Sequence, residues 1–131
     1  MTVQSKRIRD ILDILKKSSL KLTKQRKDLI EIIFRDGDGH YTAEDIFKKT
    51  KKTKIKISLA TVYNTLNSFR RIGVLSTVKT STDKIYFDTN LNTHHHFFFN
   101  KSSELIDIDA SKIIISKLPK IPSGKKINSV N

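Results

Sequence analysis

The segment SLATVYNTLNSFRRIGVL, residues 58–75, decides the fold because it has the pattern of a capped amphipathic helix. Ser58 is a suitable N-cap and Gly73 a suitable end, and apolar residues recur between them at steps of three and four. The opposite face carries hydroxyl and amide groups and no acidic residue, so we expect it to contact a partner; an exposed face of a core helix is the alternative. The residues predicted to be buried are Leu59, Val62, Leu66, Phe69 and Ile72.

The charge of the chain indicates what that partner is. There are 26 Lys plus Arg and 13 Asp plus Glu in 131 residues, which gives a formal net charge of +13. Residues 1–90 hold 20 of the basic and 10 of the acidic residues, so most of the excess lies in the part that contains the helix. Such an excess favours a polyanion as partner, although a lysine-rich proteome produces the same pI without any nucleic acid.

The elements around this segment predict a winged helix. A first helix contains Ile8 to Leu15, a second follows the cap Thr23, and a third starts at Thr42 with Asp45 completing a capping box. Residues 48–56 are expected to be a solvated basic linker. After the helix of residues 58–73, residues 74–78 and 84–88 alternate like two strands around a polar turn. Helices followed by a β-hairpin give an α+β chain whose residues 1–90 form a winged-helix DNA-binding domain.

Residues 91–131 are predicted to form a small α/β dimerisation and sensing domain. The run from Thr93 to Phe99 is expected to be a strand, so that His94 and His96 project to one face and His95 to the other. Residues 104–108 predict a second strand, residues 110–118 a helix and residues 127–130 the start of a third strand, inside which the chain is expected to stop. Exposed Phe and Ile on so small a domain favour a homodimer.

The composition limits the remaining possibilities. Cysteine is absent, so these residues form no disulfide and no Cys-ligated structural zinc site. The N-terminal residues lack the apolar core of a signal peptide, and no window has the roughly 18 apolar residues of a membrane span. We therefore expect a cytoplasmic protein with no membrane partner.

In a winged helix the last helix before the hairpin enters the major groove, and the hairpin lies along the phosphate backbone. The start of this helix would read bases, and lysines on the hairpin would contact phosphates. The expected partner is double-stranded DNA with a palindromic operator, bound by a symmetric dimer. The predicted DNA-contacting residues are Lys21, Thr23, Gln25, Arg26, Ser58, Thr61, Tyr63, Asn64, Asn67, Lys79 and Lys84.

Five motifs resemble the Fur family of iron-responsive repressors, and together they span nearly the whole chain. They are LTKQR at 22–26, HYTAEDIF at 40–47, LATVYNTLNSFRRIGVL at 59–75, YFDT at 86–89 and THHHFF at 93–98. The THHHFF form and the absence of cysteine motifs are most similar to the iron response regulator (Irr) branch, whose members sense iron status through haem. The resemblance implies that Tyr63 contacts DNA.

Three consecutive histidines beside an apolar aromatic run favour metal or haem binding through His94, His95 and His96. The family resemblance implies a sensory metal site on His40, Asp88 and His95, in which Phe97 replaces the last expected ligand. It implies a second site on the face of His94 and His96, for which Asp107 is a further carboxylate. The ligand is expected to be haem, Fe(II), Mn(II) or Zn(II).

We therefore expect a dimeric DNA-binding regulator of iron or haem homeostasis, and no enzyme. A Fur-type repressor that senses another metal or peroxide is the alternative within the family. Two other classes are a His-metal enzyme and an RNA-binding protein. The chain lacks HExxH, a nucleophile elbow and a Gly-rich phosphate loop, which disfavours the first, and it lacks an aromatic stacking platform, which disfavours the second.

Overall fold

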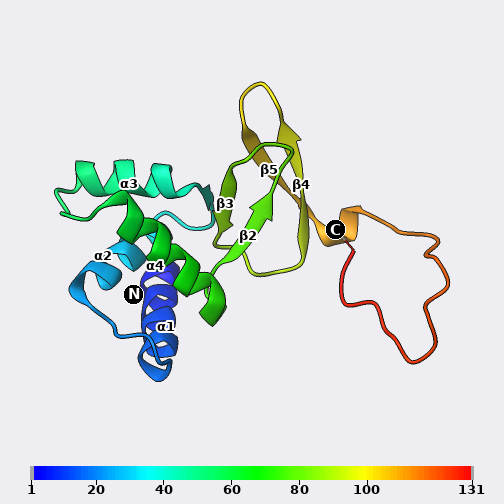
Figure 1. Cartoon of the computed structure of the whole chain (residues 1–131), viewed down its shortest axis with the longest axis horizontal. Coiled ribbons are helices and arrows are strands. Elements are labelled where there is room, and N and C mark those ends of the chain that lie inside the picture. The colour runs from blue at the N-terminus through cyan, green and yellow to red at the C-terminus, as the bar shows by residue number, and fades with distance from the viewer. Residues whose placement is uncertain (1, 131) are drawn as a thin grey trace. The chain divides into compact units, whose positions relative to one another are not determined.

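The computed structural model describes residues 2–130 and divides the chain into two units, the first ending at Asn92 and the second beginning at Thr93. Unit 1 contains four helices, and each begins after a hydroxyl side chain that accepts a hydrogen bond from a backbone N–H of the first turn. Figure 1 labels these elements. The helices are α1 (Val3–Lys17), α2 (Lys24–Phe34), α3 (Ala43–Lys52) and α4 (Leu59–Ile72), and their caps are Thr2, Thr23, Thr42 and Ser58.

The wing of unit 1 is an antiparallel hairpin. Strands β2 (Ser76–Lys79) and β3 (Ile85–Asp88) pair, and the two-residue strand β1 (His40–Tyr41) adds to the other edge of β3. Helix α4 ends at Gly73, whose φ of 98° is the left-handed conformation that turns the chain from the helix into β2. The predicted winged helix is thus confirmed, with β1 as an addition that the sequence did not predict.

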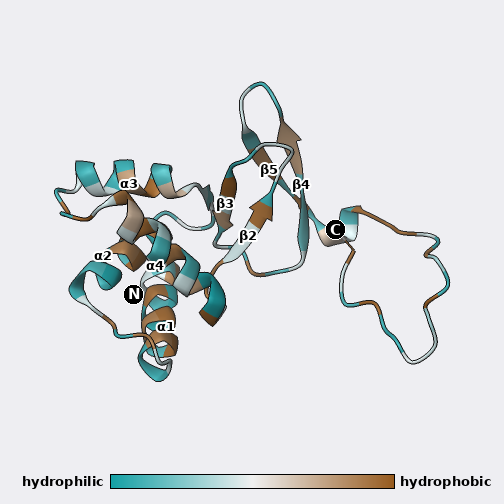
Figure 2. Cartoon of the chain, in the orientation of Figure 1, coloured by the Kyte–Doolittle hydropathy of each residue, from teal (hydrophilic) through white to brown (hydrophobic). Residues whose placement is uncertain are grey.

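One apolar core holds unit 1 together. Helix α2 contributes Leu29, Ile30, Ile33 and Phe34, all of them buried, as the sequence predicts. Figure 2 shows apolar colour along α1 and mostly hydrophilic colour along α3. The other buried apolar residues of the core are Ile8, Ile11, Leu15, Ile32, Ala43, Ile46, Val62, Leu66, Phe69, Val74, Leu75 and Phe87.

Arg7 ties the first helix to the end of the wing. Its guanidinium donates hydrogen bonds to the carboxylate of Asp38 and to the carbonyl of Thr89, and it lies 5.1 Å from the centre of the Phe34 ring. The loop before β1 and the residue after β3 are therefore joined through a side chain of α1.

Two expectations for unit 1 are wrong. Residues 48–52 belong to α3 rather than to a linker, and Thr50 in the middle of that lysine run is fully buried, with its hydroxyl donating to the carbonyl of Phe47. Leu59 was placed on the buried face of α4 but is 37% exposed. It is the first residue of the helix, where the core beneath the helix ends, and Thr65 is buried in the stripe instead.

Unit 2 is a two-stranded antiparallel sheet followed by an irregular segment. Strand β4 (His94–Phe99) pairs with β5 (Glu104–Asp109), and a single 3₁₀ turn, η1 (Ala110–Lys112), follows. The predicted helix over residues 110–118 is therefore wrong beyond that turn, and so is the predicted strand over residues 127–130. Residues 113–130 are exposed throughout, so no apolar contact stabilises regular structure there.

Candidate functional site

The exposed face of α4 carries hydrogen-bonding groups and no charge at its N-terminal end. Thr61, Tyr63 and Asn64 are exposed, and Asn67 is half-buried. Tyr63 is 40% exposed, and its ring meets the buried ring of Phe87 in β3 edge-on, with centroids 6.3 Å apart. Its phenol is thus positioned by a wing residue, and its exposed part is available to a partner.

The start of α4 is stiffened by its own cap. The hydroxyl of Ser58 accepts a hydrogen bond from the backbone N–H of Thr61 at 3.1 Å, and the two hydroxyl oxygens are 2.8 Å apart. These hydroxyls therefore have partners within the chain, and each keeps capacity for at least one more hydrogen bond.

Three residues at the start of α2, all predicted to contact DNA, have partners within the chain. Thr23 caps α2 by accepting from the N–H of Arg26, and the Arg26 guanidinium donates to the carbonyl of Lys21. The amide of Gln25 donates to the carbonyl of Lys56 at 2.9 Å, which fixes the segment before α4 against the start of α2. The ammonium of Lys21 is exposed. Through these contacts Gln25 and Arg26 help to hold the start of α2 in place. Direct contact of either residue with DNA stays a prediction.

The wing presents two exposed lysines, one at the end of each strand. Lys79 ends β2, and Lys84 precedes β3. The tip between them is ordered by the Thr82 N–H, which donates to the hydroxyl of Thr80 at 3.2 Å, and by the Lys84 N–H, which donates to that of Thr82 at 3.3 Å. The tip therefore holds both lysines at one end of the hairpin.

Unit 1 also contains a histidine–carboxylate pair. His40 of β1 is directly opposite Asp88 of β3, and His40 Nε2 lies 3.6 Å from Asp88 Oδ2. The Asp88 side chain is 1% exposed, and its other oxygen accepts from the Asn90 N–H at 2.9 Å. The family resemblance implies both residues as metal ligands, and the pairing of β1 with β3 explains why they meet.

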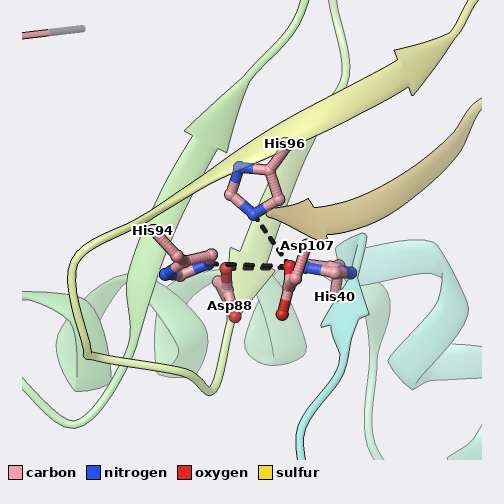
Figure 3. Close-up of side chains that lie close together, drawn as sticks. All are labelled: His40, Asp88, His94, His96 and Asp107. Atoms are coloured by element: carbon pink, nitrogen blue, oxygen red, sulfur yellow. Dashed lines mark ion pairs between the residues drawn. The ribbon is translucent and has the colours of Figure 1, made fainter. Parts of the chain in front are cut away.

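Unit 2 contains a second group, His94, His96 and Asp107, which we call the histidine group. Asp107 Oδ1 lies 3.6 Å from His94 Nε2 and 3.2 Å from His96 Nε2, and the two imidazole centroids are 4.5 Å apart. Figure 3 shows both rings directed toward the Asp107 carboxylate, with the two ion pairs dashed. The period of two in β4 brings the histidines to one face, and the register of β5 places Asp107 opposite His96.

His95 is not part of the histidine group. It pairs with Ile108, and the alternation of the strand directs it to the face away from His94 and His96. Asp109 lies opposite His94, but its carboxylate accepts from the hydroxyl and the backbone N–H of Ser111, and these hydrogen bonds lower the pKa of Asp109. Asp109 is thereby held in the turn that caps η1.

The histidine group fits a divalent cation. One donor atom from each of its three residues lies within 4.8 Å of the others. Two ligands bound about 2.1 Å from one metal ion are roughly 3.0 to 3.4 Å apart at octahedral or tetrahedral angles, close to the separations found here. Mixed imidazole and carboxylate donors without thiolate suit Fe(II), Mn(II) or Zn(II).

Within residues 2–130 every helix is too short or too polar to span a lipid bilayer.

Comparison with known proteins agrees with this architecture. The chain is 31% identical over 110 residues to the ferric uptake regulation protein of Haemophilus ducreyi, covering 82% of this chain and 69% of the relative. It is 28% identical over 93 residues to the peroxide-responsive repressor PerR of Staphylococcus epidermidis, covering 71% of this chain and 61% of the relative. The crystal structure of the Vibrio cholerae ferric uptake regulator superimposes with a TM-score of 0.67 at 29% identity, covering 73% of this chain and 74% of that one.

The match spans 69% of the length of the first curated relative named and 61% of the second. The model of the ferric uptake regulator family matches residues 17–130, which include α2 to α4, the wing and the histidine group. The chain belongs to the ferric uptake regulator family, whose members are transcription regulators rather than enzymes.

Proposed function

We propose that this protein is a dimeric, cytoplasmic repressor that binds palindromic DNA operators and responds to a divalent metal ion, in control of iron homeostasis. The observation that carries the proposal is the exposed face of α4, on which Thr61, Tyr63 and Asn64 offer neutral hydrogen-bonding groups beside a basic wing. Neutral donors and acceptors read base edges, whereas lysines such as Lys79 and Lys84 bind phosphates of any sequence.

The proposed metal ligands are those of the histidine group. When bound, the ion supplies a fixed positive charge that holds His94, His96 and Asp107 together. Three protein ligands leave room for additional ones. In keeping with the family resemblance, we also propose His40 and Asp88 of unit 1 as metal ligands, and His95 as the residue of the trio that matters least.

Metal ions are better candidates than haem, although the Irr resemblance keeps haem as a candidate. His94 and His96 lie on one face of β4 with centroids 4.5 Å apart, so they are not placed to ligate haem iron from opposite sides. The cysteine that ligates haem in many proteins is absent. A response to peroxide is a second candidate, supported by the similarity to the S. epidermidis repressor.

A dimer is proposed because unit 2 leaves apolar side chains uncovered. Phe97 is 61% exposed and Ile106, directly opposite it, 44%, while Phe99 on the same face is 45% exposed. A second copy of the chain would remove this surface from water and would place two α4 helices on the two halves of a palindrome.

The experiment is a DNA-affinity titration with a matched pair of variants. A duplex selected from a random pool by the wild-type protein is titrated at fixed ionic strength, without metal and with Mn(II), Zn(II), Fe(II) or haem. We expect a divalent ion to change the affinity at least fivefold, His96→Ala to abolish the change, and His95→Ala to retain it, because His95 lies on the other face of β4.

Each part of the proposal has its own contradicting result. Equal affinity for selected and random duplexes would refute sequence-specific binding. Equal affinity with and without every ion would refute the metal response, and a change with haem alone would assign the sensor to haem. Loss of Fe(II)-supported binding on addition of hydrogen peroxide, with Mn(II)-supported binding unaffected, would assign the peroxide response instead.

A further inference from the structure

The chain has a second basic surface, separate from the face of α4 and from the wing. Residues 46–82 contain nine Lys or Arg and no Asp or Glu, and six of the nine are lysines at positions 48 to 56. These six lie on the last turns of α3 and on the turn that follows it. The electrostatic excess of unit 1 is therefore concentrated at the end of α3.

Two of the six lysines already have a structural role. The ammonium of Lys49 lies 4.3 Å from the centre of the Tyr41 ring, and that of Lys51 lies 4.6 Å from the centre of the Phe47 ring. Such cation–π contacts contribute to packing. The remaining four, Lys48, Lys52, Lys54 and Lys56, are exposed, and within residues 2–130 none of them forms an ion pair. We call these four the lysine cluster.

The macrodipole of α3 does not account for the whole cluster. Cations in the last turn of a helix stabilise it, which explains Lys49, Lys51 and Lys52. Lys54 and Lys56, in contrast, come after the C-cap residue Thr53, where that effect has largely disappeared. Their charges need another explanation.

Lys54 has an unfavourable backbone conformation. Its φ is +58°, the left-handed region in which Gly or Asn is usual after a helix. The turn is set by hydrogen bonds on both sides, from the Thr53 N–H to the carbonyl of Lys49 and from the Ile55 N–H to that of Thr50 at 3.0 Å. A lysine at this position makes the turn less stable than a glycine would. What lysine supplies there and glycine does not is a positive charge.

The position of the cluster relative to α4 is fixed within unit 1. The carbonyl of Lys56 accepts from the amide of Gln25, and Ser58, two residues further, caps α4. The cluster is thus anchored at the N-terminal end of the helix that we propose to read bases, and its ammonium groups carry no acidic partner.

We propose that Lys54 and Lys56, with Lys48 and Lys52, bind backbone phosphates of duplex DNA beside the bases contacted by α4. The inference rests on the proposed DNA-binding function, and it adds a sequence-independent contact surface to it. Four exposed lysines that form no ion pair within residues 2–130 are suited to a repeating array of phosphates, and each neutralised phosphate releases counterions and steepens the salt dependence.

The test compares two double variants with equal loss of charge. Lys54→Gly with Lys56→Gln removes two cluster charges, and Lys125→Gln with Lys126→Gln removes two exposed charges of unit 2. Affinity for a selected duplex and a random duplex is measured over a salt series. We expect the cluster variant to flatten the slope of log K against log [salt] by about two units per subunit and to weaken both duplexes equally, and the control to match wild type.

Thermal unfolding separates this role from a structural one. Glycine relieves the left-handed conformation at position 54, so the cluster variant should melt at the same temperature as wild type or higher. Weaker DNA binding by a variant of undiminished stability would support the proposal. A slope equal to that of the control variant would overturn it.

Failure of the proposed function gives a different result. If wild-type protein binds selected and random duplexes equally, sequence-specific reading is refuted, and the cluster is still tested by the slope on random duplex. If the cluster variant loses affinity for duplex RNA but keeps its affinity for duplex DNA, the surface is an RNA site and the assignment to DNA is wrong.

Discussion

The ring of Tyr63 on α4 meets the ring of Phe87 on β3 at 87°, with the two centroids 6.3 Å apart. Phe87 is buried in the core, whereas Tyr63 is 40% exposed. An edge-to-face pair of this kind contributes about 0.5 to 1.5 kcal/mol beyond the burial of its surface. The contact therefore fixes the direction of a side chain that we propose to read DNA.

Tyr63→Phe isolates the hydroxyl of this side chain. The ring contact with Phe87 is retained, so the free energy of unfolding should change little. If the hydroxyl contacts a base, affinity for the selected duplex should fall by about 1 kcal/mol, and Tyr63→Ala should lower it by up to about 3 kcal/mol. Binding isotherms on selected and random duplexes measure this, and an equal loss on both would show that Tyr63 does not discriminate sequence.

Lys79→Ala tests the wing. A lost phosphate contact should weaken binding to every duplex and reduce the salt slope by about one unit per subunit. Lys84→Ala, at the other side of the same tip, should have a similar effect. An unchanged slope in both variants would mean that the hairpin does not touch the DNA backbone.

Thr42→Ala tests the capping box of α3. The hydroxyl of Thr42 accepts from the Asp45 N–H at 3.1 Å, and the Asp45 carboxylate accepts from the Thr42 N–H at 2.9 Å. The variant should lower the free energy of unfolding by about 1 kcal/mol, measured by urea denaturation. Thr53→Ala, an exposed threonine at the other end of the helix, is the control and should cost less.

Gly73→Ala tests the joint between α4 and the wing. A Cβ at this position would meet nothing within 4 Å, so the substitution has no steric cost from neighbours. The φ of 98° alone should make alanine less stable by about 1 to 2 kcal/mol. Asparagine tolerates this conformation better than alanine, so Gly73→Asn should lower the free energy of unfolding by less. Equal free energies of unfolding for wild type, Gly73→Ala and Gly73→Asn would refute the argument.

Much of unit 1 follows from the sequence because its signals are local. The caps Thr23, Thr42 and Ser58 and the left-handed Gly73 are confirmed, since each depends on a hydrogen bond or a dihedral angle within a few residues. Strand β1 was not predicted, because two residues have no periodicity to detect. The burial of Thr50 was missed because the surrounding lysines dominate the composition of that stretch.

The sequence predicted those parts of the candidate site that depend on the alternation of side chains along a β-strand. His94 and His96 share a face because side chains in a strand repeat every two residues. Asp107 was only a possible carboxylate, because its approach to both histidines depends on the register of β5 against β4, which sequence patterns do not determine. The helix and strand expected after residue 110 failed for a related reason, since residues 113–130 have no partner surface within unit 2.

The hydrogen bond from Arg7 to the carbonyl of Thr89 joins residues 82 positions apart. During synthesis on the ribosome, the first helix therefore cannot complete its contacts until the end of the hairpin has emerged. Nascent chains that stop before residue 89 should leave α1 loosely attached, and unit 1 should become resistant to protease only when that residue is free of the exit tunnel.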